Sequence, residues 1–185
     1  MRLFKRQRLR SLLAGLVLLA APVAHAGTVP EHELKLALTY KVAKFVSWPA
    51  VRESAPSFLL CVLGQNPFED ALDGIIGLTV KDRAIAVRHG DSVAELGSAC
   101  DLVFISHSES ERLGDVLAEL AGEPVLTVSD VAHFAASGGI VELESRGTRI
   151  GFTINVAAYR RAGLTISSQL LELATLVGAE TASGP

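Results

Sequence analysis

Short, continuous runs of apolar residues recur along this chain and alternate with segments that have helical spacing. Residues 58–63 and 102–105 form two such runs, and 125–128 is a third that only Thr127 interrupts; each is too short for a buried helix and is bounded by polar or turn-forming residues. A strand has this continuous apolar pattern when both faces of a mostly parallel sheet are covered. The alternation therefore predicts an α/β fold: a single three-layer domain with a mostly parallel sheet and helices on both faces.

The segment 28–48 has the spacing of an amphipathic helix. Its apolar stripe repeats every three or four residues and consists of Leu34, Leu38, Val42 and Phe45. Thr28, with Glu31 three positions later, has the pattern of an N-terminal cap, and Pro49 disfavours helical geometry at Trp48. We therefore expect a helix that begins after Thr28, buries one broad face and ends at Trp48, whose indole would be a packing anchor.

Helix-start signals follow two of the predicted strands. Asn66 followed by a proline predicts a helix over about 68–76, with Asn66 as its N-cap. Ser108 and Glu111 have the spacing of a capping box for the next helix along the chain. Both signals indicate strand-to-helix turns of the kind that connect parallel strands.

Beyond position 138 the pattern changes to two neighbouring strands. They occupy about 140–154 around a turn at Gly147, which predicts an antiparallel hairpin near the C-terminal edge of the sheet. Asn155 then ends the second strand and is expected to cap one long final helix. Apolar spacing extends this helix to Val177, with a kink at Gly163.

The first 26 residues have the organisation of a secretory signal peptide. Five basic residues precede an uncharged apolar run at 12–21, and Ala24 and Ala26 give the small-x-small pattern of a signal peptidase site. The apolar run is about half of the roughly 20 residues that a membrane-spanning helix needs. We expect cleavage after Ala26 and a protein that works in the periplasm.

The segment that would remain after cleavage is acidic and long enough for one domain. Removing the five basic residues of the signal segment from the 17 Lys and Arg leaves 12 against 20 Asp and Glu, a net charge of −8. An acidic chain without a basic cluster is not expected to bind nucleic acid. Residues 27–177 are expected to form one α/β domain, and the small polar residues of 178–185 a disordered tail.

The chain has two cysteines, Cys61 and Cys100, which lie in and just before two predicted strands. In an oxidising compartment a single pair is more often bonded than free, and closing a loop of about 40 residues would contribute about 4 kcal/mol on the chain-entropy model. We predict a disulfide. The alternative is two buried small residues that never meet.

Few side chains have the spacing that catalysis or metal binding requires. The histidines of the mature segment stand on different predicted elements, and no zinc, calcium or nucleotide-binding motif occurs, so we expect no metal and no cofactor. Ser106, His107, Ser108 and Glu109 follow a strand end, but no G-x-S-x-G turn supports them, and helix capping explains the serines. Glu142 and Glu144 would lie on a solvated sheet face. We expect a protein that is not an enzyme.

Several short motifs in a fixed order resemble the YfiR family of periplasmic proteins. They are YKVAKFVSWP (40–49), LCVLG (60–64) with NPF (66–68), CDLVFI (100–105) with SE (108–109), LTVSD (126–130), GGI (138–140), IN (154–155) and GLTISSQLL (163–171). The motifs extend over nearly the whole chain that follows the signal segment.

The resemblance implies a regulator that holds an inner-membrane diguanylate cyclase inactive by binding its periplasmic sensor domain. Withdrawal of the regulator by an outer-membrane-associated partner would then raise cyclic di-GMP and favour biofilm growth. The resemblance also implies an α/β homodimer with redox-sensitive cysteine pairs. Cys61 and Cys100 match one pair, whereas Ala135 and Glu142 stand where the second pair is expected. The first places to search for a partner surface are the hairpin at 140–152 and the N-terminal helix.

Two other hypotheses remain open at this point. A small-molecule binding module could use a cleft at the strand ends near Gly64, Asn66 and 106–108, where α/β sheets place ligands. A hydrolase could use Ser108 and His107, provided that the two side chains meet.

Overall fold

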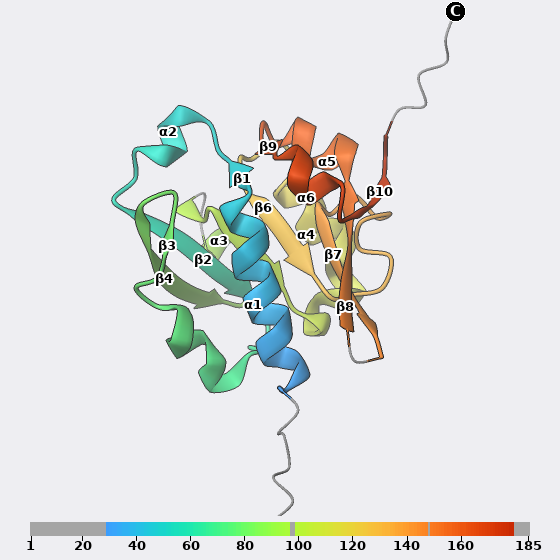
Figure 1. The fold of residues 1–185 in the computed structure, drawn as a ribbon, viewed down its shortest axis with the longest axis horizontal. Coiled ribbons are helices and arrows are strands. Elements are labelled where there is room, and N and C mark those ends of the chain that lie inside the picture. The colour runs from blue at the N-terminus through green and yellow to red at the C-terminus, as the bar shows by residue number, and fades with distance from the viewer. Residues whose placement is uncertain (1–28, 97–98, 148, 180–185) are drawn as a thin grey trace, which may run out of the picture.

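The structure, a computed structural model, describes residues 29–96, 99–147 and 149–179. Its centre is a curled, eight-stranded sheet (Figure 1). In spatial order the strands are β10 (Thr175–Val177), β8 (Arg149–Asn155), β7 (Val141–Arg146), β6 (Leu126–Ser129), β5 (Leu102–Ile105), β2 (Ser57–Leu63), β4 (Arg83–Gly90) and β3 (Thr79–Val80). The predicted signal peptide, 1–26, and residues 180–185 of the predicted tail lie outside the described residues.

Helical segments connect most of these strands. They are α1 (Glu31–Lys44), α2 (Ala50–Glu53), η1 (Glu69–Ile75), α3 (Val93–Leu96), η3 (His107–Arg112), α4 (Leu113–Glu119), α5 (Val156–Arg161) and α6 (Ser168–Leu171), where η marks a 3-10 helix. A small second sheet pairs β1 (Val46–Ser47) with β9 (Thr165–Ile166). None of the helices among the described residues is long and apolar enough to cross a membrane.

The main sheet is mostly parallel, as predicted. β2 pairs in parallel with β4 and β5, and the parallel pairing continues from β5 through β6 to β7. The predicted hairpin is the antiparallel pair β7 and β8, one strand in from the edge that β10 forms. A second antiparallel pair, β3 and β4, closes the opposite edge.

Alternate residues of β2 show why the apolar runs are continuous. Phe58, Leu60 and Val62 pack in one buried cluster with residues of α1, which crosses the front of the sheet in Figure 1. Cys61 and Leu63 point to the other face and pack in a second cluster with residues of α4. Both faces of the sheet are therefore covered, which confirms the three-layer prediction.

The ends and the buried face of α1 differ from the prediction. The helix begins at Glu31 with Pro30 as N-cap and no side-chain cap, while Thr28 lies outside the described residues. It ends at Lys44 because the next residues leave the helix to form β1, which pairs with β9. The buried residues of α1 are Leu36, Thr39, Val42 and Ala43. Half of the predicted stripe is therefore not on the core face: Leu34 and Phe45 are 37% and 41% exposed, whereas Val42 is buried and Leu38 packs partly buried against the core.

Two predicted caps are also wrong. Asn66 does not cap a helix: its Oδ1 accepts from the amide of Phe68, and the 3-10 helix η1 begins only at Glu69. Ser106, not Ser108, is the N-cap of η3, because its side chain accepts from the amide of Ser108. Both turns are tighter than an α-helix start, so the capping residue lies elsewhere than the spacing suggests.

The long final helix is broken into short elements. Asn155 caps as predicted, since its Oδ1 accepts from the amide of Ala158 at 2.9 Å, but α5 ends at Arg161. Gly163 has a φ of +67°, a left-handed conformation that glycine adopts without strain. The chain then pairs with β1 through β9 and returns to the sheet edge as β10.

Candidate functional site

The strand ends proposed as a ligand cleft are filled by side chains. Gly64 has a φ of +82°, and a Cβ at this position would overlap Ser108 Oγ and the Glu109 carboxylate. The amide of Gln65 donates to Ser108 Oγ at 3.0 Å, which ties the end of β2 to η3. The space between Gly64 and Ser108 is thus a packed contact, and it offers no room for a small molecule.

The same contacts give both candidate serines structural roles. Ser106 Oγ caps η3, and Ser108 Oγ donates to Glu109 Oε1 at 3.2 Å while it accepts from Gln65. No hydrogen bond joins either hydroxyl to His107 among the described residues, and the His107 side chain is exposed. A nucleophile and its base need such a contact, so the geometry does not support the hydrolase hypothesis. Within the described ranges, no three His, Cys, Asp or Glu side chains converge as metal ligands would.

Cys61 and Cys100 form a disulfide, as predicted. Cys61 lies in β2, Cys100 lies just before the neighbouring strand β5, and their Cα atoms are 6.0 Å apart. Both side chains are fully buried on the sheet face that is opposite to α1. The bond therefore links two strands that already pair.

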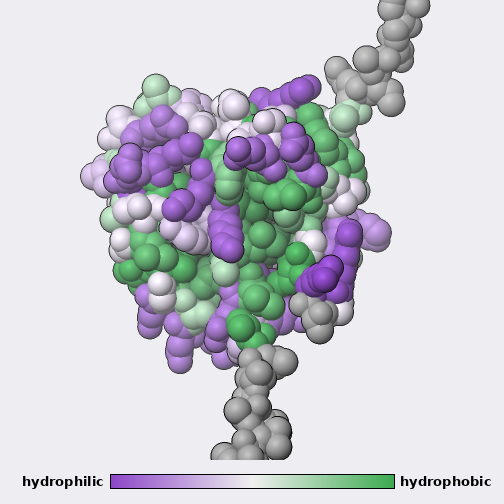
Figure 2. Space-filling view, in the orientation of Figure 1, coloured by the Kyte–Doolittle hydropathy of each residue, from purple (hydrophilic) through white to green (hydrophobic). Residues whose placement is uncertain are grey.

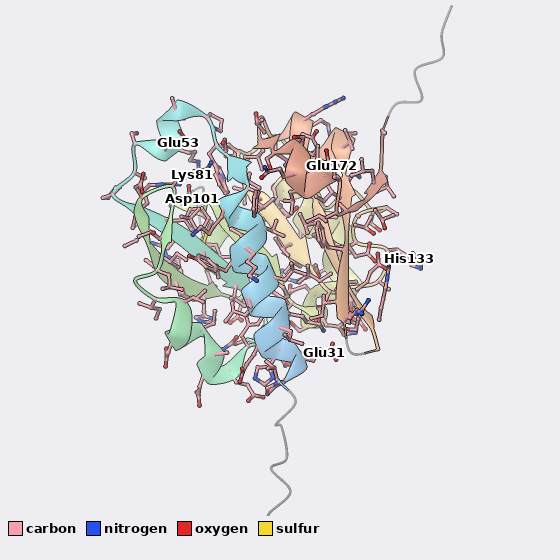
Figure 3. All side chains as sticks on the ribbon, in the orientation of Figure 1. Glu31, Glu53, Lys81, Asp101, His133 and Glu172 are labelled. Atoms are coloured by element: carbon pink, nitrogen blue, oxygen red, sulfur yellow. A yellow bond between two sulfur atoms is a disulfide. The ribbon has the colours of Figure 1, made fainter. Side chains whose placement is uncertain are left out.

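A buried ion pair lies beside the disulfide. Arg83 and Asp101 are 6% and 2% exposed, and their nearest N–O distance is 3.1 Å. Arg83 also donates to the carbonyls of Arg52 and Ser57. The Asp101 carboxylate accepts from the amide of Leu59 at 2.8 Å. This polar knot joins the α2 region to the first residues of β2, β4 and β5 (Figure 3).

Trp48 completes the knot and is a packing anchor, as predicted. Its indole NH donates to the Asp101 carbonyl at 2.9 Å, and its ring meets Phe58 edge to face at 5.2 Å. The side chain is 4% exposed. Together with the disulfide, the knot closes this end of the molecule, and none of its polar groups is available to a ligand.

Glu142 bridges the place where the family resemblance implies a second cysteine pair. Its carboxylate accepts from the amide of His133 at 2.9 Å and from the amide of Ala135 at 3.0 Å. Glu142 and Ala135 therefore meet, but through a charge-assisted hydrogen bond. The expected solvated sheet face is wrong in this respect: both Glu142 and Glu144 are half-buried and hydrogen-bonded.

Glu144 has its own partners on the hairpin. Thr153 donates to Glu144 Oε1 at 2.5 Å, and Arg146 donates to Oε2 at 2.6 Å. The hydrogen bond from Thr153, followed by that from Arg146, holds the pKa of Glu144 below its ordinary value. The carboxylate is thus stabilised in its charged form and unsuited to act as a general acid near neutral pH.

A set of polar contacts latches α1 to the hairpin side of the sheet. Lys35 Nζ lies 2.7 Å from both Glu31 Oε1 and Asp130 Oδ2, and Ser145 on β7 donates to Glu31 Oε1 at 2.6 Å. Burial of the Lys35 ammonium acts to lower its pKa, but the hydrogen bonds to the two carboxylates outweigh burial and raise the pKa above its ordinary value. The hydrogen bonds from Lys35 and Ser145 lower the pKa of Glu31. We call these four side chains the α1 latch.

An apolar groove runs along α1 beside the latch. Two hollows, of about 420 and 380 Å³, adjoin one another and share Leu34, Arg149 and Ile150 as lining residues. Val29 lines the first hollow, and Leu38 with Lys41 the second. Figure 2 shows a band of apolar surface between α1 and the β7–β8 hairpin. We call this feature the α1–hairpin groove.

The groove joins two regions that the sequence marked separately. The hairpin and the N-terminal helix were each a place to search for a partner surface, and the structure makes them the two walls of one groove. The signal that could have revealed the groove was the spare apolar stripe on α1. The spacing predicts that Leu34 and Val42 share one core-facing stripe, but Leu36, outside that stripe, shares the buried face with Val42 and leaves Leu34 exposed.

Comparison with known proteins shows the family of this chain through one match and its fold through another. A family model described as YfiR/HmsC-like matches residues 32–175. Among solved structures, the chain resembles a conserved domain protein from Vibrio cholerae O1 biovar eltor, with a TM-score of 0.51 and 12% sequence identity. The match covers 81% of this chain and 61% of that chain, and at this identity it shows a shared fold only.

Proposed function

We propose that this chain, which belongs to the YfiR/HmsC-like family, is a periplasmic regulator that lowers cyclic di-GMP by repressing an inner-membrane diguanylate cyclase. It would bind the periplasmic sensor domain of the cyclase and release it to an outer-membrane-associated partner. The observation that carries the proposal is the family match, which extends over most of the described chain. The regulator would act as a homodimer, as the family resemblance implies.

The geometry of the molecule supports a protein that acts by binding a partner. The serines at the strand ends are engaged in turns, and the polar knot is closed to ligands. The α1–hairpin groove, in contrast, is an exposed apolar surface, and the cationic residues Lys41 and Arg149 lie along it. A concave apolar surface with a polar rim is typical of a protein-binding site.

Repression requires selective binding to one state of the partner. A regulator that moves a two-state cyclase from 99% active to 99% inactive must favour the inactive state by about 5.5 kcal/mol. A few well-buried anchor residues can supply a difference of this size. No catalytic group is needed for this role.

The test is a deletion in the native host, complemented with wild-type protein exported to the periplasm. We expect deletion to raise cellular cyclic di-GMP and complementation to restore it, measured by mass spectrometry of nucleotide extracts. In a strain that lacks both the regulator and the cyclase, cellular cyclic di-GMP should stay low. Unchanged cyclic di-GMP after the single deletion, in a host that expresses an active cyclase with a periplasmic domain, would contradict the proposal.

A further inference from the structure

The N-terminal helix has two apolar faces, and the sheet covers only one of them. Leu36, Val42 and Ala43 are buried against the sheet, whereas Leu34 and Phe45 remain 37% and 41% exposed. A helix that is apolar on opposite sides is expected to be covered on both. The exposed face of α1 is therefore a surface that lacks its cover in the isolated chain.

The hairpin turns this exposed face into a groove of defined shape. Ile150 on β8 lines both hollows together with Leu34 of α1, and Leu38 of α1 joins them in the second hollow. From Glu31 to Lys41 the lining residues follow α1 over ten positions, about 15 Å at the helical rise, and Val29 extends the groove just before the helix. A groove of this length, with one helical wall, fits about three turns of a second helix laid along it.

Charge selects among the possible occupants. Lys41 and Arg149 line the groove, and neither forms a salt bridge with any acidic side chain in the described ranges. Glu31 lines the first hollow as well, but its carboxylate is already paired with Lys35. An occupant with acidic residues beside its apolar stripe would pair with both. A second copy docked groove to groove would instead bring two cationic rims into one interface. A membrane surface is flat and would meet protruding apolar side chains, not a concave groove.

We propose that the α1–hairpin groove binds an amphipathic helix whose apolar stripe is flanked by acidic residues, contributed by the protein that this regulator controls. The inference rests on the proposed function for the identity of the partner, but the groove and its preference for an acidic helix are properties of this chain. Leu34 and Ile150 are the apolar anchors, and Lys41 and Arg149 select the charge of the partner helix.

The direct test uses synthetic peptides and the purified chain. One peptide of about four helical turns carries Leu at positions i, i+3, i+4 and i+7 with Glu on both flanks, and a matched peptide carries Lys in place of every Glu. Fluorescence anisotropy should show that the wild type binds the Glu peptide at least about tenfold more tightly than the Lys peptide. Equal affinity for both peptides, or no binding, would overturn the inference.

Variants with matched controls locate the binding. Leu34→Glu should weaken binding of the Glu peptide by about 30-fold, because it places a charge at an apolar anchor. Val51→Glu makes the same chemical change at a residue of α2 that is 77% exposed, and it should bind like the wild type. The double variant Lys41→Glu with Arg149→Glu should reverse the peptide preference. Lys81→Glu with Arg160→Glu, both exposed and outside the groove, should retain it.

Two further measurements assign the occupant. Analytical ultracentrifugation compares the oligomeric state of the wild type with that of Leu34→Glu. If the wild type is a dimer and Leu34→Glu is a monomer, a second copy covers the groove and the inference is wrong. Binding of the wild type, but not Leu34→Glu, to vesicles that contain phosphatidylglycerol would overturn it in favour of a lipid surface. Thermal melting of each variant, followed by circular dichroism, separates lost binding from lost folding. The double variant Lys41→Glu with Arg149→Glu changes only exposed residues and should have the same melting temperature as the wild type.

The cellular arm separates this inference from the proposed function. In the complemented deletion strain, Val51→Glu should restore low cyclic di-GMP and Leu34→Glu should not. If Leu34→Glu represses like the wild type while deletion still raises cyclic di-GMP, the groove inference fails and the proposed function stands. If deletion itself has no effect, the proposed function fails, and the peptide experiments still decide whether the groove binds an acidic helix.

Discussion

Two regions of this molecule, one around the polar knot and one around the β7–β8 hairpin, are each stabilised by a different kind of contact. At the knot, a disulfide and a buried ion pair join β2, β4 and β5, and the groups involved are almost wholly shielded from water. At the hairpin, α1 is attached through the latch, whose Glu31 carboxylate is largely exposed, over a groove that remains open. The knot half is built for stability, and the hairpin half keeps an apolar surface available. A binding protein needs both, because a docking surface that remains uncovered must be supported from elsewhere in the fold.

The largest effect is expected from breaking the knot. Asp101→Asn keeps the shape of the side chain but leaves the Arg83 guanidinium buried without a counter-ion, which should lower the free energy of unfolding by about 3–5 kcal/mol. Urea unfolding followed by circular dichroism measures the change. Asp115→Asn on α4, where the carboxylate is exposed, is the control and should change stability by less than about 0.5 kcal/mol. A change below 1 kcal/mol at Asp101 would mean that the knot does not support the fold as described.

Removal of the disulfide should be the next largest effect. Cys61→Ala with Cys100→Ala opens a link between residues 39 positions apart and should cost about 2–4 kcal/mol of stability. Because the disulfide lies on the face opposite to α1, the double variant should bind the Glu peptide with wild-type affinity as long as it is folded. Loss of peptide binding by the folded variant would show that the two halves are coupled.

Glu142 provides an intermediate case on the hairpin side. Glu142→Gln replaces one charged acceptor by an amide NH₂ that cannot accept from the backbone, so one of the two bonds to His133 and Ala135 is lost. We expect a loss of about 1–3 kcal/mol and faster hydrogen exchange in residues 131–139. Glu123→Gln, at an exposed position, is the matched control. Unchanged exchange in that segment would contradict the bridging role of Glu142.

The smallest effect is expected at the latch and depends on pH. The pKa of Lys35 is raised in the folded chain, so its contribution to stability is fully present below about pH 10.4, the ordinary lysine value, and is lost as the pH rises through the raised value. Lys35→Met should therefore lower stability by less than about 1 kcal/mol near neutral pH, and the difference from the wild type should shrink in strong alkali. Thermal melts between neutral pH and the alkaline range measure this. A difference that grows with pH would be inconsistent with the latch.

The contribution of Glu144 to the stability of the hairpin should be lost at low pH, whereas that of Lys35 is lost at high pH. The pKa of Glu144 is lowered in the folded state, so its contribution is present above the ordinary glutamate value and is lost as the pH falls through the lowered value. The hairpin should therefore lose protection from hydrogen exchange as the pH falls through the lowered pKa of Glu144. Unchanged protection of the hairpin across that range would contradict this role of Glu144.

Local patterns determined much of this fold. The continuous apolar runs identified β2, β5 and β6, and Asn155 is the cap that its position predicts. The bond between Cys61 and Cys100 is predicted because a single pair of cysteines in an oxidising compartment is more often bonded than free, and because each adjoins a predicted strand. These features depend on a few neighbouring residues and on the two-sided burial of a parallel sheet, so the sequence alone contains them.

Tertiary structure decided the features that depend on distant partners. α1 ends at Lys44 because Val46 and Ser47 pair with a strand more than a hundred residues later, and the same pairing breaks the final helix. The stripe with Leu34 and Phe45 reads as a core face in the sequence, since periodicity shows that a face is apolar but not what covers it. Only packing added Leu36 to the predicted Val42 on the buried face of α1 and left Leu34 exposed, where it lines a groove with the hairpin.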